Sequence, residues 1–228
     1  MRAALDAELN GLIANLARMV RLASSMINDA SIALHQGDLA LAERVIAQRD
    51  DIQAILDGIE QRCVTVLALQ APVARDLRVV VAALHAVDHV NRMATLARHI
   101  AIITRLGRPH AMNSGKVRPL LARMSLLVSQ LAEDAAAAIE YQDPLCCHRL
   151  AVADGEVDAL HRRLTGILFA QDWSHGVKEA VNTALIGRYY ERFADHAVAI
   201  ARQVYYLTTG RVPEFIAVKA TSAASCRS

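Results

Sequence analysis

Aromatic residues are rare in this sequence, and glycine and proline are also scarce. Aromatic side chains make up 4% of the 228 residues, and there are only 10 glycines and 5 prolines. Such a composition disfavours a sheet with many tight turns and favours long helices. Hydrophobic residues still reach 54%, so the core must be built from alanine, leucine, valine, isoleucine and methionine. We therefore predict an all-α protein.

Several signals of particular protein classes are also missing. The formal charge is only +2, and no basic block alternates with aromatic residues, which argues against a nucleic-acid-binding protein. No C-x-x-C pair occurs, which indicates reduced thiols in a cytosolic protein. The longest strongly apolar runs, such as VVVAAL, fall far short of the ~20 residues that span a bilayer, and the N-terminus lacks a signal-peptide apolar region. We expect a cytoplasmic protein without membrane insertion. The four cysteines are Cys63, Cys146, Cys147 and Cys226.

Apolar residues recur at spacings of three and four through most of the chain, which predicts six helices. Gly37 and Pro72 are expected to end the first and second helices. Asp38, Asp76 and Asp143 are placed to cap the second, third and fifth helices. The apolar residues assigned to the inner faces of the last two helices include Phe169, Val177, Val181 and Leu185.

The pattern divides into two similar halves. The longest break is GRPHAMNSGK at residues 107–116, and the motifs before and after it correspond. RMATLARHIA at 92–101 matches RFADHAVAIA at 192–201 in five of ten positions. We predict two tandem, pseudo-symmetric three-helix bundles: a first repeat at 1–107, a linker at 108–115, a second repeat at 116–210 and a flexible tail at 211–228.

Two pairs of acidic residues stand out in the second half. Glu191 and Asp195 lie four residues apart in one helix, and Asp154 and Asp158 lie four apart in the preceding helix. Residues four apart share a helix face, and helices joined by a short loop are antiparallel neighbours. If the two pairs lie at the same height, four carboxylates converge, and a bound cation would remove their repulsion. Oxygen ligands suit iron, manganese, magnesium or calcium.

A simpler interpretation of these acids stays open, as do two further possible metal ligands. An acidic pair at this spacing is more often a solvated surface, and nearby arginines could neutralise the carboxylates. His85 and His89 are four apart with Asp88 between them, a spacing that can bind zinc but is more often a packed or solvated pair. His161 follows Asp158 by three residues and could join the acidic site.

APVARDLR at 71–78 and YYERFADHAVAIA at 189–201 resemble the PhoU family of phosphate-uptake regulators, in its actinobacterial type. The likeness covers about residues 5–210, including the duplication. It implies an E/D-x-x-x-D motif in each half and iron or zinc clusters on outer helix faces. Carried onto this chain, it assigns Asp154, Asp158, Glu191 and Asp195 as metal ligands. The cation could be Fe, Zn, Mg or another divalent ion.

The first half departs from that family pattern. Alignment of the halves places Arg49 opposite Asp154 and Gln53 opposite Asp158. Asn91 stands where Glu191 does, and Thr95 stands where Asp195 does. All four acidic positions have lost their carboxylates, so we expect metal in the second repeat only. The loss also leaves open that the chain is a diverged copy rather than the main regulator.

The resemblance implies a regulatory adaptor and not an enzyme. Family members are thought to repress phosphate-starvation signalling by linking a phosphate ABC transporter ATPase to a sensor histidine kinase. We expect those partners, a homodimer and no nucleic acid. The first alternative is a metal-independent helical interaction module. The least favoured alternative is a carboxylate-bridged metalloenzyme, because the sequence contains no E-x-x-H, P-loop or G-x-S-x-G motif.

Overall fold

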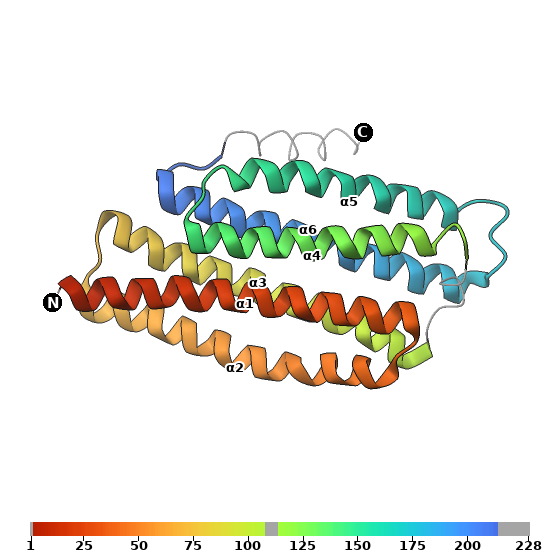
Figure 1. Ribbon diagram of the computed structural model, residues 1–228, viewed down its shortest axis with the longest axis horizontal. Helices are drawn as coiled ribbons and strands as arrows, with labels where there is room; N and C mark the ends of the chain where they lie inside the picture. Colours follow the sequence, from red (N-terminus) through yellow and green to blue (C-terminus); the bar gives the residue numbers. More distant parts are fainter. Residues whose placement is uncertain (1, 108–113, 214–228) are drawn as a thin grey trace.

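The protein folds into six long helices, as a computed structural model shows (Figure 1). The structure describes residues 2–107 and 114–213, and no strand occurs within those ranges. The helices are α1 (Arg2–Gln36), α2 (Leu39–Gln70), α3 (Ala74–Gly107), α4 (Arg118–Tyr141), α5 (Cys146–Leu168) and α6 (Gly176–Thr209). The predicted all-α fold with tandem helical bundles is confirmed. The tail from residue 214 and most of the predicted linker lie outside the described residues.

All six helices run along the length of an elongated molecule (Figure 1). Helices α1 to α3 pack together, and α4 to α6 form the corresponding group. The two groups join through α1 against α4 and through α3 against α6, while α2 and α5 lie on the outside. The buried apolar side chains form one continuous cluster through both groups. The two three-helix groups therefore pack against each other around one shared core.

Small side chains let the central helices approach closely. Alanine is the commonest buried residue in each of α3, α4 and α6, and α1 buries four alanines. The large side chains between them are few, and the largest fully buried one is Tyr190 of α6. Its hydroxyl lies 2.8 Å from Ser31 Oγ of α1, and Ser31 donates its own hydrogen to the carbonyl of Ile27 at 2.6 Å. This contact joins the first helix of one half to the last helix of the other.

One predicted helix cap is confirmed and two are corrected. Asp38 accepts a hydrogen bond from the backbone N–H of Leu41 at 2.9 Å, after Gly37 ends α1 in the left-handed region with φ 74°. Asp76 lies inside the first turn of α3, and its buried carboxylate pairs with Arg2 at 2.8 Å. Asp143 accepts from the N–H of Leu145 in a turn that precedes α5, because α5 begins only at Cys146.

The outer side of the second half differs from the prediction in one respect. Phe169 follows the end of α5 and is 85% exposed, whereas it was expected on an inner face. Val177 and Val181 of α6 are also exposed, at 80% and 51%, and Leu185 is partly exposed. The first half of α6 therefore presents apolar side chains to solvent. None of the described helices is long and apolar enough to cross a membrane.

Candidate functional site

The four first-half positions that correspond to the second-half acids meet in one hydrogen-bonded cluster between α2 and α3. Arg49 Nη2 donates to Asn91 Oδ1 at 2.7 Å and to Gln53 Oε1 at 2.9 Å. Arg49 Nε donates to Thr95 Oγ1 at 3.2 Å. All four side chains are half-buried. The guanidinium of Arg49 thus lies among three oxygen acceptors, as a cation would lie among oxygen ligands.

This cluster bears on metal binding in the first repeat. A fixed guanidinium occupies the centre of the group, and it carries its positive charge at every physiological pH. The surrounding acceptors are neutral amides and a hydroxyl, so they supply no negative charge that would neutralise a divalent cation. In the first repeat the Arg49 guanidinium therefore lies where a metal ion would lie. The side chains that could bind a metal there already accept hydrogen bonds from Arg49.

Arg49→Ala is expected to lower the free energy of unfolding by about 1–2 kcal/mol, because charged hydrogen bonds to three half-buried acceptors are lost together. The matched control is Arg44→Ala on the same helix, where the exposed side chain should change stability by no more than about 0.5 kcal/mol. Urea unfolding followed by far-UV circular dichroism measures both variants. Equal midpoints for the two variants would contradict a stabilising role for the cluster.

The second half places its acids along the contact between α5 and α6. The two helices approach closely at Gly187, where an added Cβ would lie 2.6 Å from Leu164 Cδ2 and 3.2 Å from His161 Cδ2. The helices are antiparallel. One turn after Gly187 on α6 therefore lies opposite one turn before His161 on α5, which brings Glu191 towards Asp158. A further turn brings Asp154 towards Asp195. The register is therefore the one that the sequence predicts for convergence of the two acidic pairs.

Glu191 feels the charges of two of the other acids. Burial raises the pKa of Glu191, and the charges of Asp195 and Asp158 raise that pKa further. Arg188 and Arg192 lower it, and the Arg188 guanidinium donates to Glu191 Oε2. The Glu191 side chain is only 13% exposed. Its carboxylate is thus desolvated beside two like charges, which is a setting that a divalent cation would relieve.

The fourth acid, Asp154, is buried on α5 at 1% exposure. As the side chains stand, no group of three or more His, Cys, Asp and Glu residues within 2–107 and 114–213 is assembled to hold a metal ion. The four acids therefore fit a cation by their charge, burial and register, but they would have to turn towards it. Metal binding by Asp154, Asp158, Glu191 and Asp195 stays a prediction.

The histidines singled out in the sequence lie in two places. His161 is half-buried beside Gly187, and burial lowers its pKa, as does the charge of Arg188. His89 of α3 meets a residue that the sequence did not connect with it, His196 of α6, with 3.2 Å between the two Nδ1 atoms. Burial lowers the pKa of His89 and lowers that of His196 to about 4. His85 is exposed one turn from His89.

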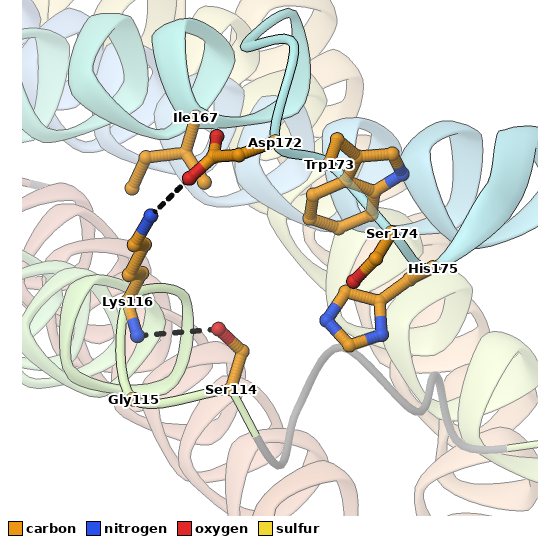
Figure 2. Close-up of a pocket in the computed structure, with 8 residues that line it drawn as sticks. All are labelled: Ser114, Gly115, Lys116, Ile167, Asp172, Trp173, Ser174 and His175. Carbon is orange, nitrogen blue, oxygen red and sulfur yellow. Dashed lines mark hydrogen bonds and ion pairs between the residues drawn. The ribbon is translucent and has the colours of Figure 1, made fainter.

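A separate open pocket of about 330 Å³ lies between the start of α4 and the turn from α5 to α6 (Figure 2). Lys116 Nζ donates to Asp172 Oδ2 at 2.6 Å across its mouth, and Trp173 and His175 form the opposite wall. The Trp173 indole N–H donates to the carbonyl of Gly176 at 3.0 Å. The positive charge of Lys116 and the negative charge of Asp172 pair with each other, so the pocket offers no unbalanced charge to a ligand.

The described cysteines do not form a reactive centre. Cys63, Cys146 and Cys147 are free thiols and fully buried. Burial raises the pKa of Cys63 to about 11 and that of Cys146 to about 12. These thiols therefore stay protonated and unreactive at neutral pH. Cys226 lies outside the described residues.

Comparison with known proteins identifies the family. The PhoU domain matches the chain twice, over residues 16–104 and 121–204. The chain belongs to the PhoU family. The "Phosphate-specific transport system accessory protein PhoU homolog 2" of Mycobacterium tuberculosis is 38% identical over 213 residues, which cover 93% of this chain and 100% of that protein. PhoU homolog 1 of Mycobacterium leprae is 38% identical over 214 residues, or 94% and 96% of the two chains.

Solved PhoU structures have the same fold. The crystal structure of PhoU from Pseudomonas aeruginosa matches with a TM-score of 0.82 at 26% identity, over 90% of this chain and 99% of that one. The PhoU similarity therefore extends over both halves, including the half whose acidic positions are replaced. Sequence reasoning located Arg49, Gln53, Asn91 and Thr95 through the internal repeat. It missed His196 as a partner of His89, and no spacing rule could have paired residues 107 positions apart.

Proposed function

We propose that this protein is a regulatory adaptor that represses phosphate-starvation signalling and phosphate uptake. It would do so by linking the ATPase of a phosphate ABC transporter to a sensor histidine kinase in the cytoplasm. The observation that carries the proposal is the match along almost the whole chain to accessory proteins of phosphate-specific transport. The mycobacterial relatives match 93–94% of the chain, and the family match takes in both repeats.

The proposed role needs surfaces rather than catalysis. Long helices offer extended faces for docking partner proteins. The exposed apolar side chains at the start of α6, Val177 and Val181, are available for such contacts. We assign no catalytic residue, and we expect the adaptor to act as a homodimer.

The second repeat would carry a divalent cation as part of this role. Asp154, Asp158, Glu191 and Asp195 would bind it between α5 and α6, through oxygen ligands that suit Fe, Zn, Mg or a similar ion. Support comes from the raised pKa of Glu191, which burial, Asp195 and Asp158 cause. When bound, the cation would balance these charges and fix α5 against α6, which gives a partner a rigid surface.

The experiment is affinity capture from phosphate-replete cells, with the full chain as bait. We expect recovery of the transporter ATPase, the sensor kinase or both, and loss of the gene should switch on phosphate-starvation genes in replete medium. Val177→Glu with Val181→Glu tests the exposed α6 face, and Val152→Glu, exposed on α5, is the control. Recovery of neither partner class by the unaltered chain would overturn the proposal.

The first alternative is a metal-independent adaptor, and one observation favours it. The Arg49 cluster holds α2 against α3 without a metal, so this fold can close an outer helix with side chains alone. Complementation separates the two ideas. If Asp158→Ala with Glu191→Ala restores repression in a deletion strain as well as the unaltered gene does, the metal is dispensable.

A further inference from the structure

We propose that His89 and His196 bind a transition-metal ion of the zinc type between α3 and α6. His89 belongs to the first repeat and His196 to the second, and their rings lie with centroids 5.4 Å apart and planes tilted by 43°. The site would thus lie on the contact between the two repeats. It is separate from the acidic positions, which lie between α5 and α6.

The distance between the two nitrogen atoms is the main evidence. Zinc binds imidazole nitrogen at ~2.0–2.1 Å in tetrahedral geometry, so two such ligands of one ion lie about 3.3–3.4 Å apart. The two Nδ1 atoms are 3.2 Å apart and share a hydrogen bond, in which one ring donates its N–H to the other. A metal ion would replace this hydrogen, with both neutral rings then protonated on Nε2. An ion placed to one side of the line that joins the two nitrogens would reach both of them after small rotations of the rings. Both residues are only partly buried, so the pair is not sealed in the core.

The surrounding charges decide which ions the pair can take. Asp88 is the acidic group near both rings, and it favours a cation. Arg92 and Arg192 face His196, while His85 and Arg202 face His89, and these groups oppose a cation. An ion that depends on charge alone, such as Mg²⁺ or Ca²⁺, is therefore disfavoured. Ions that bind neutral imidazole strongly, namely Zn²⁺, Cu²⁺ and Ni²⁺, fit best, with water or Asp88 completing the coordination.

The rest of this helix contact explains why only one such site is expected. Further along the seam between α3 and α6, His99 lies against Tyr189 with ring centroids 5.2 Å apart and ring planes tilted by 46°. A tyrosine there replaces the second imidazole, and an un-ionised phenol is a poor ligand for zinc. A metal at His89 and His196 would therefore connect the repeats at a single point. Because it binds only the folded chain, it should raise the unfolding temperature.

The test is a Zn²⁺ titration of the full chain, followed by calorimetry and by the imidazole ¹⁵N resonances. We expect one zinc-binding event that shifts the Nδ1 resonances of His89 and His196, since an imidazole nitrogen that binds zinc changes its electronic environment. His196→Asn keeps a polar group near the place of Nδ1 but lacks the imidazole nitrogen. It should lose this binding event and the zinc-dependent rise in unfolding temperature. His85→Asn should keep both.

Three results would overturn the proposal. The first is an unaltered chain in which zinc leaves the His89 and His196 resonances unchanged. The second is zinc binding that survives His196→Asn but not His85→Asn, which would place the ion on α3 alone. The third is zinc binding lost in Asp158→Asn with Glu191→Gln and kept in His196→Asn, which would place all zinc at the acidic site. Circular dichroism of each variant confirms that the helices are intact.

Discussion

Replacing Tyr190 with alanine is expected to lower the free energy of unfolding by about 3–5 kcal/mol. Tyr190 is the largest fully buried side chain, and it lies on α6 against Ser31 of α1. Removing the ring leaves a cavity in a core built mainly from alanine and aliphatic residues, which cannot easily collapse. The loss should be measured by urea unfolding.

Two companion variants separate packing from hydrogen bonding. Tyr190→Phe keeps the ring, and Ser31 still donates to Ile27, so the loss should be only about 1 kcal/mol. Tyr141→Ala removes a tyrosine that is 76% exposed, and it should change stability by no more than about 0.5 kcal/mol. Because one core runs through both halves, the whole chain should unfold in a single transition. Two separate transitions, or a small effect of Tyr190→Ala, would contradict the shared core.

The second large effect is expected at the acidic site. Asp158→Ala combined with Glu191→Ala should abolish binding of an oxygen-preferring cation such as Mn²⁺, because it removes one carboxylate from each helix. Without metal the variant should be no less stable than the unaltered chain, since burial and two like charges already raise the pKa of Glu191. Mn²⁺ uptake followed by electron paramagnetic resonance measures the first effect, and thermal unfolding measures the second.

The control for this double variant removes two acids elsewhere. Glu156→Ala with Asp172→Ala changes the net charge by the same amount, and both residues form exposed ion pairs, with Arg123 and Lys116 respectively. Such pairs contribute little to stability. If the control loses Mn²⁺ to the same extent, the binding is non-specific and the assignment of the acidic site is wrong.

Most of the fold could be predicted from the sequence because helical periodicity is a local property. Six apolar stripes, a left-handed Gly37 and the capping side chain of Asp38 each act within a few residues. The internal repeat then related Arg49 to Asp154, and the structure places Arg49 with Gln53, Asn91 and Thr95. Local signals and one alignment were enough for these features.

The errors arose where a neighbouring helix decides the outcome. Val177 and Val181 have the spacing of an inner stripe, but no helix within the described ranges buries them, and they are 80% and 51% exposed. Asp143 has the residue type of a cap, but two turn residues separate it from α5. The pairs His89 with His196 and Ser31 with Tyr190 join distant parts of the chain, and only the three-dimensional arrangement of α1, α3 and α6 reveals them.

The central proposal is that this PhoU chain binds a cation in one repeat and has an arginine at the corresponding place in the other. Anomalous diffraction from crystals soaked in Mn²⁺ tests it most directly, because the map locates each bound ion. The account predicts a peak between α5 and α6, within coordination distance of Asp158 and Glu191, and none beside Arg49. A peak among Arg49, Gln53 and Asn91, or four acids turned apart around no ion in the soaked crystals, would contradict it.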